Sequence, residues 1–223
     1  MKTLKIQTLA ACCLALAVSA CATQPSVAPN KASAKQCEKW QVHNRKATFS
    51  KDQEGTVYFA AQAKPGVAWL KSNQISDGVI EADIKGHDTK DKSYVGIAFR
   101  GVDEKTYEAV YFRPFNFNAP DDLHKSHAVQ YESEPDHAWD KLRKEHPDVY
   151  EHAIVPAVNP NDFFHVKIVL ENPKVRVYIN NASEPTLVVD SLASQKSGWV
   201  GFWMGNNADG TFKNLKITPA VGH

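Results

Sequence analysis

The sequence has few cysteines, no excess of either charge sign and no long hydrophobic run. Four cysteines occur in 223 residues, and Cys12, Cys13 and Cys21 belong to an N-terminal segment that reads as a targeting signal. Cys37 is then left without a partner, so no disulfide framework is predicted. Lysine and arginine number 26 against 25 acidic residues. This balance excludes the strong positive field that nonspecific nucleic-acid binding requires, and we expect no nucleic-acid partner.

Several sequence signatures that would identify a function are also missing. No phosphate-binding loop, dinucleotide fingerprint or Gly-x-Ser-x-Gly elbow occurs. The 11 glycines and the charged residues follow no repeat, which excludes collagen-like and coiled-coil chains. The chain does have an apolar fraction of 43%. That fraction is enough for a domain of this length to bury a core without a structural metal.

The first twenty residues carry the features of a secretory signal. Lys2 and Lys5 precede an uncharged apolar run, Leu9–Val18, which is too short to span a bilayer as a helix. The run ends at Val18-Ser19-Ala20-Cys21, which resembles the bacterial lipobox, where an acylated cysteine becomes the new N-terminus. We expect residues 1–20 to be a signal peptide and Cys21 to be lipidated. An ordinary signal peptide with a chance cysteine is the alternative.

The segment after Cys21 predicts how the domain is held. Residues 21–36 are rich in alanine, serine and proline and contain no aromatic residue, as is typical of a flexible tether. Ala22, not aspartate, follows the cysteine. By resemblance to lipoprotein sorting patterns, this implies the outer membrane of a bacterial envelope. A multiply acylated cysteine anchors stably where one chain would not.

The sequence from about Cys37 onward has the pattern of β-strands. Apolar and polar residues alternate with period two in many short runs separated by turn residues, and no long helical stripe recurs. This pattern predicts an all-β fold, a single antiparallel β-sandwich over 37–223, with a short helical or irregular insertion at about 115–160. The clearest alternating segments are 80–85, 94–100, 109–113, 164–170, 175–180 and 199–205.

Three segments carry a resemblance to a known superfamily. They are Tyr94–Arg100 (YVGIAFR), Tyr107–Asn116 (YEAVYFRPFN) and Gly198–Gly205 (GWVGFWMG). With their strand order, they resemble the concanavalin A-like lectin/glucanase sandwiches, and are most similar to bacterial 3-keto-disaccharide hydrolase-like and family 16 glycoside hydrolase-like domains. The resemblance covers roughly residues 40–218. It implies a jelly roll of two curved sheets whose concave face holds carbohydrate.

The alternation predicts which side chains occupy that face. If Val95, Ile97 and Phe99 point between the sheets, the opposite phase presents aromatic and planar polar groups among small residues. Aromatic rings stack on the C–H side of a sugar, and guanidinium and amide groups bind hydroxyls in pairs. The predicted carbohydrate-binding residues are Arg100, Tyr111, Arg113, Asn116, Gln130 and Trp203.

A structural interpretation of the same residues stays open. Arg100 and Arg113 could pair with acids such as Glu108 or Glu132 across the sheet, as on an ordinary solvated face. Trp203 could be covered by the 115–160 insertion and belong to a second small core.

Catalytic residues are harder to assign. The family 16 motif places three acids on one strand, and here Glu81 and Asp83 match while Lys85 or Gly86 stands at the acid/base position. This incomplete motif leaves Glu81 and Asp83 as surface residues. A 3-keto sugar would need only one general base and a cation near the keto oxygen. His127 is the candidate base for that chemistry, with Arg100 or Arg113 as the cation.

No cofactor is predicted, although calcium at an edge of the sandwich is compatible with this fold class. His124-x-x-His127 with Asp121 and Asp122 has the residue types of a metal site, but is interpreted as a polar loop. The sequence therefore predicts an envelope lipoprotein that binds carbohydrate in a groove. The alternatives are a glycoside hydrolase or lyase that uses the same groove, and a structural lipoprotein without a sugar ligand.

Overall fold

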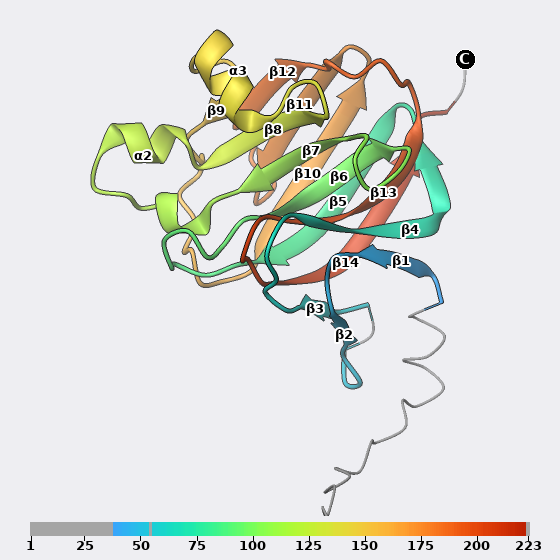
Figure 1. Cartoon of the computed structure of the whole chain (residues 1–223). Helices are drawn as coiled ribbons and strands as arrows, with labels where there is room; N and C mark the ends of the chain where they lie inside the picture. The colour runs from blue at the N-terminus through green and yellow to red at the C-terminus, as the bar shows by residue number, and fades with distance from the viewer. Residues whose placement is uncertain (1–37, 54, 222–223) are drawn as a thin grey trace, which may run out of the picture.

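The computed structural model describes residues 38–221 with the exception of residue 54 (Figure 1). The expected signal peptide, the tether, Cys21 and Cys37 therefore lie outside the described residues. Within those residues, the helices are all too short or too polar to cross a membrane.

The described chain consists almost entirely of strands. Two short α-helices and one 3-10 turn fall in the middle of the sequence. The strands are β1 (Trp40–His43), β2 (Ala47–Phe49), β3 (Val57–Phe59), β4 (Gly66–Ile75), β5 (Gly78–Lys85), β6 (Val95–Gly101), β7 (Tyr107–Phe112), β8 (Val129–Glu134), β9 (Glu151–His152), β10 (Phe164–Glu171), β11 (Lys174–Ile179), β12 (Leu187–Asp190), β13 (Gly198–Met204) and β14 (Gly210–Pro219). The helical elements are η1 (Pro114–Asn116), α2 (Asp122–Ser126) and α3 (Trp139–Glu145).

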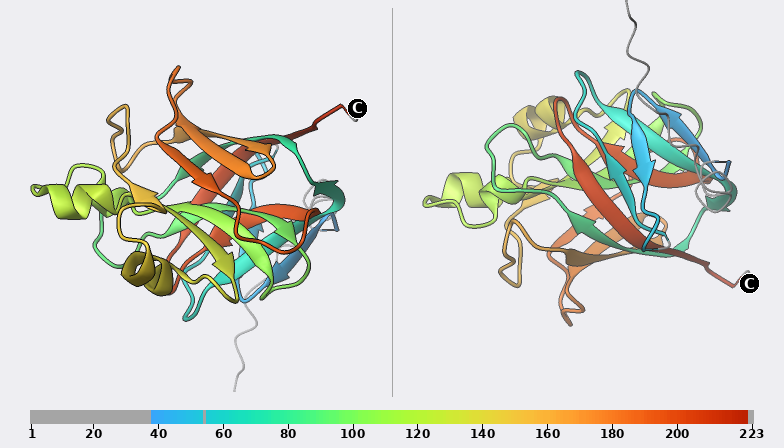
Figure 2. Two further views of the ribbon diagram at one scale, coloured as in Figure 1. Left: turned by 90° about the horizontal axis from the view of Figure 1, so that it is seen from above. Right: turned by 90° about the horizontal axis from the view of Figure 1, so that it is seen from below.

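The strands form two antiparallel sheets that pack face to face, as the views from above and below show (Figure 2). The first sheet has the order β1-β4-β13-β6-β7-β8-β9 and the second has the order β12-β11-β10-β5-β14-β3-β2. Strands that are far apart in sequence become neighbours, such as β13 between β4 and β6. The predicted all-β class and the two-sheet sandwich are confirmed.

The main hydrophobic core lies between the sheets. Val95, Ile97 and Phe99 of β6 point into it, as the alternation predicts. In β5, β10 and β11, buried residues alternate with residues that are less buried, so each strand of the second sheet contributes one face to the core. Burial of this apolar surface is the dominant stabilising contribution.

A second, smaller hydrophobic cluster lies on the outer face of the first sheet. Trp69, Tyr107, Tyr111 and Trp203 belong to it, with Tyr94 and Trp199 packed at its margin. The small residues between them are needed for this packing. A Cβ at Gly96 would lie 2.6 Å from the Cβ of Tyr111, so a glycine here lets the tyrosine ring lie against the sheet.

The segment predicted as an insertion contributes both strands and helices. It supplies β8 and β9 to the edge of the first sheet, and it carries η1, α2 and α3. The register pairs Tyr111 of β7 with Gln130 of β8. Both helices lie at this edge, beside β8 and β9 (Figure 1). Helix α3 borders the outer face of the first sheet and also inserts Leu142 into the margin of the main core.

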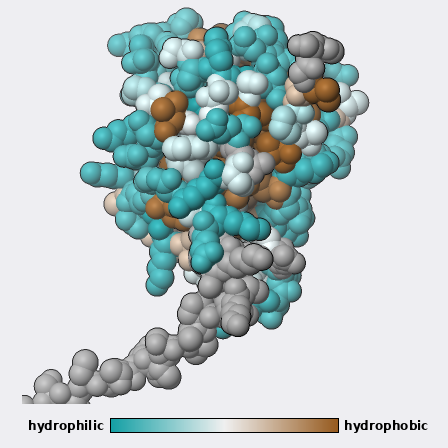
Figure 3. All heavy atoms as spheres, turned by 90° about the vertical axis from the view of Figure 1, so that its right-hand side faces the viewer, coloured by the Kyte–Doolittle hydropathy of each residue, from teal (hydrophilic) through white to brown (hydrophobic). Residues whose placement is uncertain are grey.

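The rest of the surface has a mixed character. On the face shown in Figure 3, hydrophilic residues cover most of the surface and apolar residues form small groups between them. The large apolar side chains that are exposed come from different elements, for example Tyr58 of β3 and Val188 of β12. Scattered exposed apolar residues are ordinary in soluble domains and do not by themselves mark a site.

Candidate functional site

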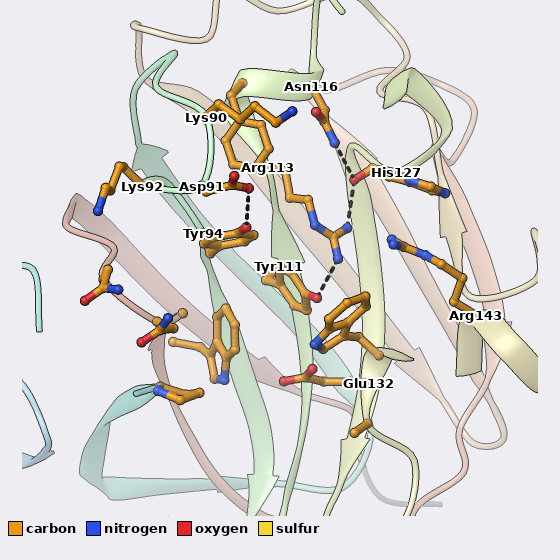
Figure 4. A pocket seen from close by; sticks show the side chains of 18 of the residues that line it. Lys90, Asp91, Lys92, Tyr94, Tyr111, Arg113, Asn116, His127, Glu132 and Arg143 are labelled. Carbon is orange, nitrogen blue, oxygen red and sulfur yellow. Dashed lines mark hydrogen bonds between the residues drawn. The ribbon is translucent and has the colours of Figure 1, made fainter. Parts of the chain in front are cut away.

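A pocket of about 660 Å³ opens on the outer face of the first sheet (Figure 4). This volume is in the range that binds small ligands. Its floor comes from β7, β8 and β13, and its walls come from α3 and from the loops that precede β6 and follow β13. The lining residues are Pro65, Lys90, Asp91, Lys92, Tyr94, Tyr111, Arg113, Phe115, Asn116, His124, His127, Glu132, Glu134, Ala138, Trp139, Arg143, Trp203, Gly205, Asn206 and Asn207.

Aromatic rings form the floor of the pocket. Tyr111 and Trp203 stack with their ring centroids 4.5 Å apart, and Tyr94 meets Tyr111 edge to face at 6.5 Å. The indole Nε1 of Trp203 donates to the hydroxyl of Tyr107 at 3.1 Å. Trp203 is 5% exposed, so it belongs to the small outer cluster and still reaches the pocket. Trp203 therefore packs in a small core and also forms part of the pocket floor, so the two interpretations are compatible.

Arg113 lies immediately after β7 and is held by uncharged groups. Its Nη1 donates to the backbone carbonyl of His127 at 2.8 Å, and its Nη2 donates to the Tyr111 hydroxyl at 2.8 Å. A longer bond joins Nη2 to Oε1 of Gln130 at 3.4 Å. The guanidinium also lies 4.9 Å from the centroid of the Tyr111 ring. These contacts fix the guanidinium in one orientation at the pocket wall.

The other predicted polar residues occupy different depths. Asn116 lines the pocket, and its Nδ2 lies 3.5 Å from the carbonyl of His127. Gln130 is on the predicted face but is fully buried beneath the pocket, where its Nε2 donates to the backbone carbonyls of Tyr131 and Tyr150. Gln130 thus lies behind Arg113 and supports it.

Arg100 lies away from the other predicted binding residues. The β6–β13 register shifts between Trp199 and Gly201, and Arg100 has a left-handed φ of 46°. A bulge inserts an extra residue and breaks the alternation, so the side chain turns to the end of the main core. There its Nη1 donates to Glu108 at 2.9 Å, which is the pairing that the structural interpretation of Arg100 expected. The expectation that Arg100 shares a face with Arg113 is therefore wrong.

His127, the candidate base, lies at the C-terminal end of α2 and lines the pocket. Its Nε2 is 3.4 Å from Oε1 of Glu151. Burial lowers the pKa of His127, and the cations of Arg143 and Arg113 lower it further, while Glu151 opposes them. The imidazole is therefore neutral at pH 7 and can accept a proton.

Two other sequence motifs were candidates for a functional site, the His124–His127 segment and the pair Glu81 and Asp83. The Nδ1 of His124 is 2.8 Å from Asp121, and both belong to the short helix α2 and its N-cap, where the sequence predicts a polar loop. Within the described part of the chain, no three histidine, cysteine or acidic residues are grouped as a metal site. Glu81 and Asp83 lie on the second sheet, where they meet His165, and are remote from the pocket.

Glu132 is a pocket residue that the sequence analysis did not place in the site. It faces the pocket from β8 and is only 2% exposed. Its carboxyl group has no hydrogen-bond or ion-pair partner among the residues that the structure describes, 38–53 and 55–221. Burial raises the pKa of Glu132 to about 8, and the nearby acids Glu134 and Asp140 add to the effect, while Arg113 opposes it. Glu132 is therefore mostly protonated at pH 7, and can donate as well as accept a hydrogen bond.

This carboxyl group should make the stability of the domain depend on pH. Its pKa is 4.5 in an unfolded chain and about 8 in the folded protein. Between these values the folded state keeps a proton that the unfolded state has lost, so the free energy of unfolding falls as pH rises from 4.5 to 8. Glu132→Gln removes this dependence. It should be more stable than the wild type at pH 8 by on the order of a few kcal/mol.

Thermal unfolding between pH 5 and pH 8 checks this prediction. Glu134 and His127 titrate nearby and also contribute to the pH dependence of wild-type stability. The contribution of Glu132 is therefore obtained from the difference between the stability curves of the variant and the wild type. Glu171→Gln, which neutralises an exposed carboxylate on β10, is the control and should keep the wild-type pH dependence. Parallel curves for Glu132→Gln and the wild type would contradict the assignment.

Two further pocket residues come from α3. Trp139 is 43% exposed at the first position of the helix, and Arg143 follows one turn later with its guanidinium 4.9 Å from the Trp139 ring. Residues four apart share a helix face, which is the signal that could have placed this pair together. Leu142 is the buried residue that attaches the helix to the sheet.

Comparisons with known proteins identify the fold. The scan against family models and the search of curated proteins found no match. Solved structures do match: the carbohydrate binding module CBM66 from Bacillus subtilis is similar over 79% of this chain and 93% of the module, with 15% identity and a TM-score of 0.57.

Two other structures agree with this result. A protein of unknown function with a galectin-like fold from Bacillus subtilis covers 83% of this chain and 91% of its own, at 12% identity and a TM-score of 0.54. The exoplasmic/lumenal domain of VIP36, in its Ca²⁺/Man3GlcNAc-bound form, covers 86% and 88%, at 12% identity and a TM-score of 0.53. The chain therefore has the concanavalin A-like, galectin-like jelly-roll fold that the resemblance of its strand segments implied.

Proposed function

We propose that this protein binds carbohydrate in the pocket on the outer face of the first sheet. The observation that carries the proposal is the composition of the pocket: an exposed tryptophan, Trp139, faces a floor of stacked aromatic rings. Arg113, Asn116 and Glu132 supply hydrogen-bonding groups beside them. Aromatic surface with oriented polar groups beside it is the usual form of a small-molecule site.

The chemistry of a sugar ring matches this arrangement. One side of a pyranose presents C–H groups that pack against an aromatic ring, and its hydroxyls need both donors and acceptors. Among the structures with the same fold, one is named as a carbohydrate binding module and one contains Man3GlcNAc. These names support sugar binding as the function to test.

The test is a titration of residues 37–223 against a panel of neutral and acidic glycans that includes 3-keto disaccharides. Saturable binding, followed by calorimetry and tryptophan fluorescence, is expected for at least one saccharide. If the whole panel leaves the protein unchanged, the structural lipoprotein becomes the better interpretation.

A glycoside-processing activity is the second candidate, favoured by two groups in the same pocket. Glu132 is protonated at pH 7 and could act as a general acid, whereas the neutral His127 could act as a base. The incomplete family 16 motif contributes nothing to this proposal. Product analysis of the same mixtures separates the candidates, because a binding protein returns every saccharide unchanged.

We also propose that the protein is an envelope lipoprotein held by an acylated Cys21. The support is the sequence pattern of a basic start, a short apolar run and the lipobox-like Val18–Cys21. In a bacterial host, the full chain should fractionate with membranes, and Cys21→Ala should lose the lipid and leave the membrane fraction. Mass spectrometry of the mature N-terminus is the measurement. An unmodified N-terminus at another residue would instead indicate an ordinary signal peptide.

A further inference from the structure

We propose that the pocket is specific for an acidic saccharide, one whose ring carries a carboxylate, and that Arg113 binds this carboxylate. The inference rests on the proposed function, because it names the class of sugar that the same pocket takes. It depends on an imbalance of charge around Arg113.

Arg113 is a nearly buried cation without a counter-ion. Arg113 is 6% exposed. Among the described residues, no carboxylate oxygen lies within ion-pair distance of its guanidinium group. Its protein acceptors are a tyrosine hydroxyl, a backbone carbonyl and an amide oxygen, all uncharged. Removing a charge from water is costly unless an opposite charge is brought to it. A bound anion would supply that charge.

Two other arginines of this protein pair with carboxylates of the protein itself, without a ligand. Of the two other buried arginines, Arg100 donates to the carboxylate of Glu108 at 2.9 Å, whereas Arg45, which lies outside the pocket lining, donates to backbone carbonyls. Arg143 is bidentate to Glu151, with distances of 2.7 and 2.5 Å. Arg113 is the arginine of this group that faces the pocket without an acidic partner. Its position suggests that the partner comes with the ligand.

Arg113 also keeps donors available. A guanidinium has five N–H groups, and the Nε–H and one Nη1–H of Arg113 have no acceptor among the described residues. The guanidinium of Arg143 points toward the same region from the opposite wall (Figure 4). The Nε and Nη2 groups of Arg143 are held by Glu151, so Arg143 keeps its Nη1 donors, and each guanidinium can donate at least one N–H to an oxygen of the same carboxylate.

The charges that line the pocket, with Arg113 included, have a small excess of basic groups. Four basic side chains line it, Lys90, Lys92, Arg113 and Arg143, against three acidic ones, Asp91, Glu132 and Glu134. Glu132 is mostly protonated at pH 7, so it neither neutralises Arg113 nor repels a carboxylate. Its O–H can instead donate to the ligand.

The experiment compares acids with their own methyl esters, in which each carboxylate loses its charge and gains a methyl group. Short oligomers of galacturonate, mannuronate and guluronate and a hyaluronan fragment are titrated calorimetrically at pH 7, each beside its ester and beside neutral oligosaccharides. At least one acid should bind about 10–100-fold more tightly than its ester, the range expected for hydrogen bonds to a charged group. Added salt should weaken the binding of the acid more than the binding of the ester.

Variants then assign the preference to Arg113. In Arg113→Gln, the affinity for the acid should fall to that for the ester, while Arg176→Gln, which removes a partly exposed arginine on β11, should leave both unchanged. Arg113→Lys keeps the charge but loses the planar fork, and should retain only part of the preference. If Arg113→Gln is unfolded, the comparison of acid and ester on the wild type still decides the inference.

The possible failures are distinguishable. Equal affinity for acids and esters, or binding of neutral sugars alone, would overturn this inference and leave the proposed function intact. Binding of a sulfated galactan fragment without any uronate would overturn the choice of a carboxylate. An acid preference that survives in a folded Arg113→Gln would overturn the role of Arg113. If no saccharide binds at all, both the inference and the proposed function fail.

Discussion

Replacing Arg100 with methionine is expected to destabilise the domain by about 3–5 kcal/mol, the usual cost of leaving one member of a buried ion pair without its partner. Arg100 and Glu108 are both almost fully buried, and their Nη1 and Oε2 atoms are 2.9 Å apart. The hydroxyl of Tyr131 donates to the other carboxylate oxygen at 2.7 Å. Methionine leaves the Glu108 carboxylate in the core with one hydrogen-bond donor and no cation. The melting temperature should fall by roughly 6–20 °C.

Two comparisons make this prediction specific. Arg176 pairs with Glu171 at the surface, so Arg176→Met is a matched change that should cost about 0–1 kcal/mol. The double variant Arg100→Met/Glu108→Gln removes the stranded charge and should recover part of the loss. Urea unfolding of the purified domain measures all three. A loss for Arg100→Met no greater than that for Arg176→Met would show that the buried pair does not hold the sheet ends together.

Arg100 also shows where the sequence stops determining the structure. Strict alternation correctly places Val95, Ile97 and Phe99 in the core and Tyr111 and Trp203 on the opposite face. That reasoning works because side chains in a regular strand change face at every residue. The bulge at Arg100 reverses the alternation of side chains, and the residue types around it do not indicate a bulge.

The helical side of the pocket is harder to predict for a different reason. Alternation describes strands, whereas Trp139 and Arg143 reach the pocket only because α3 packs beside β8. Their position depends on the packing of a short helix, which single-sequence patterns do not specify. The role of Glu132 could not be predicted either. Its face follows from the register with Ala109, but its raised pKa comes from burial by surrounding segments.

Trp139→Ala should weaken saccharide binding by about 10–100-fold, the effect of removing an aromatic side chain that anchors a ligand. Trp139 is 43% exposed, so much of its ring is free for contact, whereas Tyr111 and Trp203 are mostly covered by each other and by the sheet. Arg113 and Arg143 lie 5.8 and 4.9 Å from the Trp139 ring centroid. A sugar packed on this ring is therefore within reach of both guanidinium groups.

The variant should remain folded, because Trp139 is 43% exposed and lies outside the hydrophobic clusters, and alanine favours a helix. Calorimetry with the saccharide of the panel that the wild type binds most tightly gives the affinity, and thermal unfolding confirms the fold. Tyr58→Ala is the matched control, since Tyr58 is 41% exposed but lies on β3 of the other sheet. It should bind as the wild type does. Equal affinities for Trp139→Ala and Tyr58→Ala would move the binding site away from this pocket. A loss confined to Trp139→Ala would connect the shape of the pocket to its ligand, because the ring contributes contact area there and little to the core.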